Sequence, residues 1–352
     1  MGKRIAMVGA GALGGYVGSY FAHHGQDVTL IDFWPAHIEA IRKNGFDLDG
    51  VTPEEKFVVK TAKTLHYNDL ATLASQPPFD IIFISVKSYD TERVTQAIAP
   101  YLAKDGYAVS LQNCMNEDTI AAIVGRERTV GVIASMISVE LYEAGRIRRM
   151  AEKGGTKHTV FRAGEIDGKI TDRVNELVAL FSLIDSAKAT TNLQGERWTK
   201  LTQNSMRNGF SAATGMTGRD CDNNDVIRRL SIQVGGEAIR VGRALGLQLE
   251  KMGKLMPEQI EKAASGDAAM LAEVEDIMKN RTAANPRAGI QRPSMAQDMK
   301  KGRKTEIEFM NGLIAAKGKQ VGIATPANDK LVQAVLSVET GKAKASAAVL
   351  GG

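Results

Sequence analysis

The stretch that decides the fold is Arg4-Ile5-Ala6-Met7-Val8-Gly9-Ala10-Gly11-Ala12-Leu13-Gly14. Its first five residues form a short apolar run, as in a buried strand, and a helix-like segment continues to about His24. Between the two lies the pattern G-x-G-x-x-G. The pattern is weak evidence when it stands alone, but its place between a strand and a helix predicts a loop that binds a dinucleotide. The alternative is a glycine-rich turn that holds no ligand.

Each glycine of this loop has its own predicted task. Gly9 allows the tight turn, Gly11 lets a pyrophosphate approach the backbone, and Gly14 permits close packing of the helix on the strand. The phosphates are expected at the N-terminus of the helix, where the amides of Ala12 and Leu13 lie. These five residues form the predicted phosphate-binding set.

The next predicted strand, 27–31, ends at Asp32. This is the position at which an acidic residue accepts hydrogen bonds from the adenosine ribose. A carboxylate there repels a 2′-phosphate, and no arginine follows in the segment 33–37, so Asp32 favours NAD over NADP. Alternatively, Asp32 could cap the helix that follows.

Further apolar runs at 80–86, 107–111 and 129–135 alternate with helical patterns. This alternation predicts an α/β fold with a doubly wound parallel sheet of the Rossmann type. Lys87 follows the first of these runs and Asn113 follows the second, at strand ends where open sheets bind ligands.

After residue 136 the pattern changes twice. Segments 138–142, 146–150 and 159–161 are interpreted as antiparallel strands that extend the same sheet. From about residue 170 the apolar spacing becomes helical, with helices expected near 172–181, 223–245, 257–280, 294–317 and 326–340 and a loop over 281–293. We therefore predict a dinucleotide-binding Rossmann-type domain over 1–193, an all-helical substrate-binding and catalytic domain over 194–345, and a frayed tail over 346–352.

The composition is that of an ordinary globular protein, with 43% hydrophobic and 24% charged residues in a chain of 352. The net charge of +5 is modest and no basic block is interleaved with aromatic residues, so no nucleic acid partner is expected. No apolar run is long enough to predict a membrane span. Only two cysteines occur, Cys114 and Cys221, which fits a reducing cytoplasm. No metal site is expected.

A polar stripe lies within residues 195–208 of the helical part. On one continuous helix, Lys200, Asn204 and Asn208 recur at every fourth position, along the edge of an apolar face that includes Trp198 and Leu201. A lysine and two amides in such a place could line a cleft. The plain alternative is that all three are solvated.

A second informative stretch is 292–308. Ser294 stands where a helix N-cap would, with Gln297 as its capping-box partner. If the helix is continuous, Glu306 lies about 3.3 turns further along and on roughly the same face as Ser294. Its alternation with apolar neighbours also allows Glu306 to face solvent.

Five motifs follow one another along the chain. They are G-A-G-A-L-G at Gly9, L-Q-N at Leu111, G-E-I-D-G at Gly164, W-x-K-L-x-x-N-x-x-x-N at Trp198, and R-P-S-M-x-Q-D-x-x-x-G-R-x-T-E-I at Arg292. In this order they resemble the ketopantoate reductase (2-dehydropantoate 2-reductase) family over nearly the whole chain. The last motif is the most specific, because its spacing is long and its residue types are unusual together.

The resemblance implies a nicotinamide-dependent enzyme that reduces a 2-oxo acid to a 2-hydroxy acid, or runs the reverse reaction. It places the general acid at Lys200 and its carboxylate partner at Glu306. Hydride that arrives at a ketone carbon creates an alkoxide, which a protonated amine can neutralise. A nearby carboxylate keeps the amine protonated where desolvation would otherwise lower its pKa.

The resemblance also implies the binding roles. Asn204, Asn208 and Ser294 would bind the carboxylate and hydroxyl groups of the substrate, Asn113 would lie by the nicotinamide and the substrate, and Lys87 would lie near the cofactor. By analogy with other two-domain dehydrogenases, the helical domain could carry a homodimer interface.

Three residues depart from the family pattern. Cys114 stands where the family usually has glycine, Arg207 interrupts a segment that is commonly small and apolar, and Asp32 differs from the usual preference for NADPH. The family therefore keeps NADP open as the cofactor, and the departures favour a dehydrogenase of a larger or aromatic hydroxy acid as an alternative. A dinucleotide-binding sensor without turnover is a further alternative, against which the retained lysine, glutamate, asparagine and serine argue.

Overall fold

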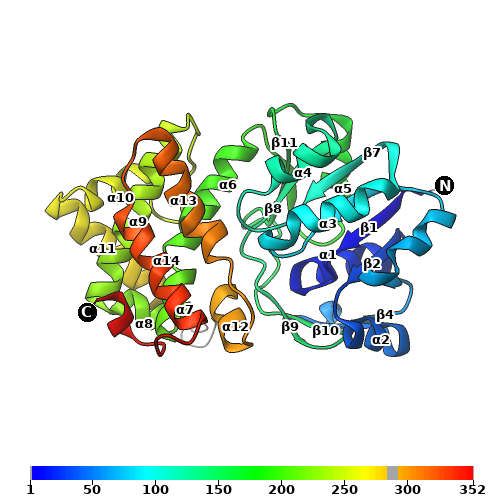
Figure 1. Ribbon diagram of the computed structural model, residues 1–352, viewed down its shortest axis with the longest axis horizontal. Helices are drawn as coiled ribbons and strands as arrows, with labels where there is room; N and C mark the ends of the chain where they lie inside the picture. The colour runs from blue at the N-terminus through cyan, green and yellow to red at the C-terminus, as the bar shows by residue number, and fades with distance from the viewer. Residues whose placement is uncertain (1, 284–291, 352) are drawn as a thin grey trace. The chain divides into compact units, whose positions relative to one another are not determined.

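The computed structural model describes residues 2–283 and 292–351. The chain divides into two compact units, Met1–Leu193 and Gln194–Gly352 (Figure 1). None of the helices that the structure describes combines the length and the apolar character needed to cross a membrane.

The first unit is built on an eight-stranded sheet in the order β12-β11-β8-β7-β6-β1-β2-β5. The strands are β1 (Arg4–Val8), β2 (Asp27–Asp32), β5 (Lys63–His66), β6 (Phe79–Ile84), β7 (Leu102–Ser110), β8 (Thr129–Ala134), β11 (Phe161–Glu165) and β12 (Ala187–Ala189). Neighbouring strands are parallel except β8 and β11. The chain moves from β1 to β2 on one side and to β6 on the other, so strand order reverses at β1. This is the place where open parallel sheets bind ligands.

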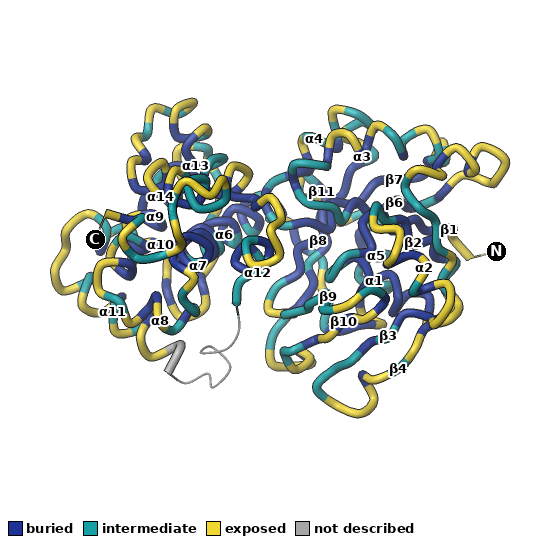
Figure 2. The backbone as a smooth tube through the Cα atoms, turned by 60° about the horizontal axis from the view of Figure 1, so that its bottom comes forward, coloured by how far each residue is buried: buried dark blue, intermediate teal, exposed yellow. Residues whose placement is uncertain are grey.

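Helices cover both faces of this sheet. They are α1 (Ala12–His23), α2 (Pro35–Asn44), α3 (Thr91–Ile98), α4 (Glu117–Val124) and α5 (Asp172–Ser182). Successive side chains of a strand point to opposite faces, so Ile5 and Met7 join the apolar layer of α1 and α5, whereas Ala6 and Val8 join that of α3 and α4. Figure 2 shows the central strands as buried, as expected for a sheet covered on both faces.

A second, four-stranded sheet has the order β4-β3-β10-β9, with β3 (Phe46–Asp49), β4 (Phe57–Val59), β9 (Val139–Glu143) and β10 (Arg146–Arg149). The prediction that 138–142 and 146–150 extend the main sheet is therefore wrong, and only β11 does so, antiparallel to β8. The reason lies in side-chain charge. Arg146 and Arg148 are exposed and pair with Asp47 and Asp49 of β3, in register and at 3.0 Å each.

The described part of the second unit is helical. Its helices are α6 (Leu193–Ser205, which begins at the last residue of the first unit), α7 (Asn208–Thr214), α8 (Gly218–Asn223), α9 (Asp225–Ala244), α10 (Pro257–Ala264), α11 (Ala268–Ala283), α12 (Ser294–Lys300), α13 (Ile307–Val321) and α14 (Pro326–Glu339). The predicted fold class, a Rossmann-type sheet followed by helices, is confirmed.

Two long helices of the prediction are each broken in two. The expected helix 257–280 is interrupted at Gly266, which has φ +97°, and the expected helix 294–317 at Gly302, which has φ +62°. A glycine in this left-handed region ends a helix, because other residues adopt it at a cost. Part of the loop predicted over 281–293 is also helix, since α11 runs to Ala283, and residues 284–291 lie outside the described residues.

The frayed tail predicted over 346–352 is wrong for its described residues. Residues Ala347–Leu350 form a 3-10 turn, and Leu350 is buried. The amide of Ser346 donates to the carbonyl of Ala213 at 3.2 Å. The tail is ordered because it buries an apolar side chain and pairs its backbone with α7.

Candidate active site

The glycine-rich loop connects β1 to α1 at the carboxyl edge of the sheet. Gly9 has φ +96°, and a Cβ on it would lie 2.7 Å from the carbonyl carbon of Ser85. A Cβ on Gly14 would lie 2.1 Å from the carbonyl oxygen of Gly9. Real Cβ atoms do not come this close to backbone, so the packing of the chain itself requires glycine at both positions.

Gly11 is different. Its φ is −66°, which any residue adopts, and a Cβ there would meet nothing within 4 Å. The described chain gives no reason for a glycine at this position, but a ligand that approaches the backbone does. The N-cap of α1 makes no side-chain hydrogen bond and the first turn carries no acidic residue, which leaves its amides suited to an anion. The loop therefore fits the pyrophosphate of a dinucleotide.

Asp32 is the last residue of β2. Its Oδ1 accepts a hydrogen bond from the amide of Trp34 at 2.9 Å, and Trp34 is the N-cap of α2 without a side-chain cap. The alternative in which Asp32 caps the helix is therefore wrong, because its carboxylate closes the turn before the helix instead. Among the described residues, none donates a hydrogen bond to Oδ2, so this oxygen remains available for a ribose hydroxyl.

Lys87 and Asn113 follow the next two strands, β6 and β7, and both are half-buried. The side chain of Gln112 ties the two loops together, because its Nε2 donates to the carbonyl of Val86 at 2.7 Å and to Oγ1 of Thr91 at 2.8 Å. The backbone of Asn113 is fixed by Nδ2 of Asn116, which donates to its carbonyl at 2.7 Å. The predicted cofactor residues thus lie at the carboxyl ends of four neighbouring strands.

Cys114 lies in the loop after β7, where the family pattern predicts glycine. It is buried and has φ +63°, the left-handed region that a glycine adopts easily. The backbone at this position thus has a conformation that suits glycine, and the cysteine adopts it at some cost in strain.

In the second unit, the expected single helix through Lys200, Asn204 and Asn208 is wrong. Lys200 and Asn204 lie on α6, which ends at Ser205, whereas Asn208 begins α7. The apolar face is confirmed, because Trp198 and Leu201 are each 1% exposed.

Hydrogen bonds from other helices satisfy carbonyls that the break releases. Oγ of Ser231 on α9 donates to the carbonyl of Met206 at 2.7 Å, and Nδ2 of Asn311 on α13 reaches that of Ser205 at 3.4 Å. Arg207 lies at the break itself, with Nη2 3.8 Å from Oδ2 of Asp222 on α8. The departure at Arg207 is thus directed toward a neighbouring helix.

Glu306 lies at the start of α13, where it is the N-cap, and is 5% exposed. It neither faces solvent nor shares a helix with Ser294, so both of those expectations are wrong. The next residue, Ile307, packs on the residue after Asn208, because its Cδ1 lies 3.2 Å from where a Cβ on Gly209 would be. The structure therefore brings the starts of α13 and α7 together.

Ser294 is the first residue of α12 rather than its N-cap, which is Pro293. The predicted capping box is wrong, since Nε2 of Gln297 donates to the carbonyl of Arg292 at 3.0 Å. Helix α12 packs on α7. Helix α7 thus has α12 and the start of α13 as neighbours.

A buried polar network under this region was not predicted. The carboxylate of Glu237 on α9 accepts the amides of Ala327 and Asn328 at 2.8 and 3.0 Å, at the N-terminus of α14. Oδ1 of Asn328 then accepts Nδ2 of Asn311 at 2.9 Å. The signal in the sequence is Glu237, an acidic residue in the middle of the apolar pattern of 223–245.

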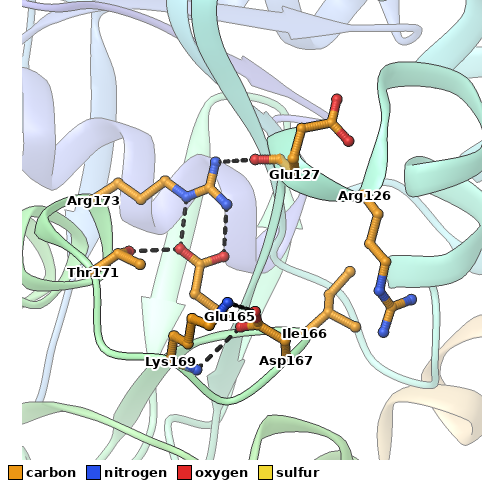
Figure 3. A pocket seen from close by; sticks show the side chains of 8 residues that line it. All are labelled: Arg126, Glu127, Glu165, Ile166, Asp167, Lys169, Thr171 and Arg173. Carbon is orange, nitrogen blue, oxygen red and sulfur yellow. Dashed lines mark hydrogen bonds and ion pairs between the residues drawn. The ribbon is translucent and has the colours of Figure 1, made fainter.

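The G-E-I-D-G motif lines a pocket of about 390 Å³ in the first unit (Figure 3). The carboxylate of Glu165 accepts Nε and Nη2 of Arg173, both at 2.7 Å, and Oγ1 of Thr171 at 2.6 Å. A Cβ on Gly168 would lie 2.5 Å from the carbonyl oxygen of Thr191, just before α6. Because Glu165 is fully engaged and the glycine packs on the chain, the motif is structural.

The predicted site residues thus form two sets. The first set lies in the first unit, at the carboxyl ends of β1, β2, β6 and β7, and comprises Gly9, Gly11, Ala12, Leu13, Gly14, Asp32, Lys87 and Asn113. The second set lies in the second unit, on α6 and at the starts of α7, α12 and α13, and comprises Lys200, Asn204, Asn208, Ser294 and Glu306.

Comparison with known proteins supports the motif evidence. Residues 5–162 match the model of the ketopantoate reductase PanE/ApbA family, and residues 192–339 match that of its C-terminal domain. The 2-dehydropantoate 2-reductase of Archaeoglobus fulgidus is 29% identical over 96% of this chain and 99% of its own length. That of Pyrococcus horikoshii is 28% identical over 92% and 94%.

Solved structures agree with this assignment. A PanE/ApbA family ketopantoate reductase from Ralstonia eutropha is 26% identical over 96% of this chain and 99% of its own, with a TM-score of 0.77. A ternary structure of D-mandelate dehydrogenase with NADH and anilino(oxo)acetate has the same TM-score at 21% identity, covering 96% of this chain and 99% of its own, and shows the fold alone. The family models together cover most of the chain, and the chain therefore belongs to the ketopantoate reductase family of nicotinamide-dependent oxidoreductases.

Proposed function

We propose that this member of the family reduces a 2-oxo acid to a 2-hydroxy acid with NADH, with Lys200 as the general acid. The observation that carries the proposal is the packing of Ile307 on Gly209, which brings the start of α13 at buried Glu306 close to the start of α7 at Asn208. Lys200 belongs to the same unit and lies on α6. The reaction also requires a bound nicotinamide cofactor, and the glycine-rich loop of the first unit fits its pyrophosphate.

The residues of this chain have distinct tasks in the reaction. When bound, the reduced nicotinamide supplies the hydride. Lys200 donates a proton to the oxygen that becomes the alcohol, and a charged Glu306 favours the protonated form of that lysine. Asn204, Asn208 and Ser294 donate hydrogen bonds that orient the substrate carboxylate and its hydroxyl groups.

The choice of NADH rests on Asp32. The oxygen that is not used by the turn can accept a hydrogen bond from the ribose, and the negative charge repels a 2′-phosphate. The side chain of Trp34, which is 38% exposed, occupies the turn beside it in place of an arginine. NADP stays an alternative because the family uses either cofactor.

A second candidate is a dehydrogenase of a larger or aromatic hydroxy acid. The solved D-mandelate dehydrogenase structures with NADH share the fold, and Arg207 and Cys114 distinguish this chain from the usual family pattern. The candidates differ in substrate and share the proposed roles of Lys200 and Glu306.

A substrate panel tests the proposal. Purified protein is assayed with NADH and NADPH against ketopantoate and against 2-oxo acids of increasing size, including aromatic ones. We expect turnover with at least one acid and a kcat/KM about tenfold or more higher with NADH. Turnover of aromatic acids alone would establish the second candidate, and tight NADH binding without any turnover would establish a sensor.

An Asp32→Ser variant isolates the cofactor choice, and Asp27→Ser, at the opposite end of the same strand, is its control. The first substitution should lower the ratio of NADH to NADPH activity, because it removes the charge that faces the ribose. The second should leave the ratio unchanged. Equal effects of the two substitutions would overturn the role of Asp32.

We also infer a reducing compartment such as the cytoplasm and a homodimer through the helical unit. The two cysteines are buried, and they lie in different units. A dimeric ketopantoate reductase from Staphylococcus aureus shares the fold at 18% identity, with a TM-score of 0.67. Light scattering of the purified protein measures the oligomeric state directly, and a monomer at working concentration would overturn the dimer.

A further inference from the structure

His37 is a buried histidine that the reaction does not use. It lies in the first turn of α2 and is 0% exposed. Its Nδ1 lies 2.9 Å from the amide nitrogen of Gly145, and its Nε2 lies 2.9 Å from the carbonyl oxygen of Ala10. An amide can only donate, so Nδ1 must accept and Nε2 must carry the proton. His37 therefore donates a hydrogen bond to Ala10, inside the glycine-rich loop.

This hydrogen bond fixes more than one atom. The carbonyl of Ala10 and the amide of Gly11 belong to one planar, trans peptide unit, so they point in opposite directions. With the carbonyl held by His37, the Gly11 N–H points away from the histidine. Gly11 is also the one glycine of the G-x-G-x-x-G pattern whose Cβ would meet nothing within 4 Å, which makes it the place where a ligand can approach.

We propose that His37 is a positioning residue for the cofactor: it orients the Ala10–Gly11 peptide so that the Gly11 amide donates to the pyrophosphate. The inference rests on the proposed role of the loop in cofactor binding. A hydrogen bond to the carbonyl also polarises the peptide, which strengthens the amide at its other end as a donor. His37 acts through the backbone and touches no reacting atom.

The surroundings of His37 keep the imidazole in place. The Trp34 ring stacks on it at 5.5 Å between centroids with an angle of 13°, and the Phe46 ring meets it edge-on at 5.3 Å and 76°. Phe46 belongs to β3, and Gly145 lies in the turn between β9 and β10. The small four-stranded sheet thus supports the cofactor loop through this histidine.

The protonation state supports the same arrangement. Burial lowers the pKa of His37 and outweighs the Ala10 carbonyl and the Asp32 carboxylate, which act in the opposite direction. A neutral ring is required, because a second ring proton would take away the acceptor for Gly145.

A pair of variants separates the two ring nitrogens. His37→Gln places an amide NH₂ near the former Nε2, so it can donate to Ala10 but loses the acceptor for Gly145. His37→Asn places an amide near the former Nδ1, so it can accept from Gly145 but loses the bond to Ala10. Each variant removes one hydrogen bond, and only His37→Asn releases the Gly11 peptide.

NADH affinity is measured by fluorescence titration and stability by thermal unfolding. We expect His37→Asn to weaken NADH binding about tenfold, the equivalent of one lost hydrogen bond, and His37→Gln to stay within about threefold of the wild type. The two should lose similar stability. Equal weakening by both, or greater weakening by His37→Gln, would show a merely structural role and overturn the proposal.

If the variants fail to fold, a measurement on the wild-type protein still tests the proposal. Long-range ¹H–¹⁵N spectra of the histidine rings should show His37 as the neutral Nε2–H tautomer at pH 7, and an Nδ1–H tautomer would overturn the proposal. The experiment also distinguishes a loop that does not bind the cofactor from a histidine that does not position the loop. If the wild type binds neither NADH nor NADPH, the loop is not a cofactor site, whereas tight binding by both wild type and His37→Asn contradicts only the inference about His37.

Discussion

The glycine-rich loop of the first unit and the helix break of the second are built in different ways. The loop presents backbone amides at the end of a strand, and two of its three glycines are required by packing against Ser85 and the loop itself. The break presents side chains at helix ends, and its released carbonyls are satisfied by Ser231 and Asn311 from other helices. A site made of backbone is encoded by local spacing, whereas a site made of side chains depends on distant residues.

The largest effects should separate the two kinds of glycine in the loop. In Gly14→Ala, the new Cβ meets backbone at 2.1 Å, so the loop must move and we expect a loss of about 3 kcal/mol or more in the free energy of unfolding. In Gly11→Ala, the Cβ meets nothing, so unfolding should change by less than about 1 kcal/mol, whereas NADH affinity should fall about tenfold or more. Chemical denaturation and NADH titration measure both. Equal destabilisation by the two variants would mean that Gly11, like Gly14, is required for folding and not for cofactor binding.

Charge burial gives the next largest effect. In the first unit the Arg149 guanidinium is fully buried and pairs with Asp185 at 2.5 Å. Arg149→Met should cost about 3–5 kcal/mol, because it leaves a buried carboxylate without its ion partner. Arg146→Met, on the same strand but exposed, should cost less than about 1 kcal/mol. Similar losses in urea denaturation would contradict the importance of burial.

The same pair predicts a dependence on pH. Burial acts to raise the pKa of Asp185, but the hydrogen bonds from Arg149 and from neighbouring amides outweigh it, so the pKa lies below its ordinary value. Such a carboxylate stabilises the fold above the unfolded pKa of about 3.9, and the contribution is lost as pH falls through the folded pKa. In Arg149→Met this loss at low pH should shrink or reverse, because burial then shifts the pKa of Asp185 upward without the guanidinium, and protonation relieves an unpaired buried charge. Unfolding curves measured between pH 3 and 7 report this shift, and coincident profiles would contradict it.

A substitution that disturbs the break between α6 and α7 should lower turnover and leave cofactor binding unchanged. Ser231→Ala removes the hydrogen bond to the Met206 carbonyl, so we expect about 1 kcal/mol of destabilisation and a lower kcat. Its NADH affinity should equal that of the wild type, because the first unit is untouched. Ser265→Ala is the control, since that exposed hydroxyl caps the end of α10 by donating to the carbonyl of Glu261. A loss of NADH affinity in Ser231→Ala would contradict the separation of the two sites.

The smallest effect is expected at Cys114. Its left-handed conformation costs about 1 kcal/mol, and Cys114→Gly relieves this strain but adds about 0.5–1 kcal/mol of chain entropy. Loss of the buried thiol side chain adds about 1 kcal/mol, so the net destabilisation should be about 1 kcal/mol or less. Cys114→Val should be clearly destabilising, because a β-branched residue tolerates this conformation poorly. Equal stabilities of the two variants would show that the loop changes shape.

The contrast between the two regions also explains what could be predicted. The strand, the glycines and Asp32 follow one another in sequence, so their spacing predicts their positions. The stripe through Lys200 and Asn208 was interpreted as one helix, because apolar periodicity continues across the break at 206–207. The interruption depends on bonds from α9 and α13, which the local sequence does not show.

The pairing of strands that are distant in the chain could not be predicted from the sequence either. The strands β9 and β10 pair antiparallel as expected, but β10 also pairs with β3, about a hundred residues earlier in the chain, instead of with the main sheet. The role of His37 depends on Gly145 in the turn between these strands. In the sequence alone, His37 is an ordinary residue of an amphipathic helix.

The most direct test of the central claim is chemical rescue of Lys200→Ala. The account predicts that this variant binds NADH as tightly as the wild type, that its turnover of the 2-oxo acid falls about 10²–10⁴-fold, and that added ethylamine, largely protonated at neutral pH, restores part of it. The matched Glu306→Ala variant should gain nothing from the amine. Turnover that survives in Lys200→Ala, or NADH binding that falls as far as turnover does, would contradict the role of Lys200 as the acid.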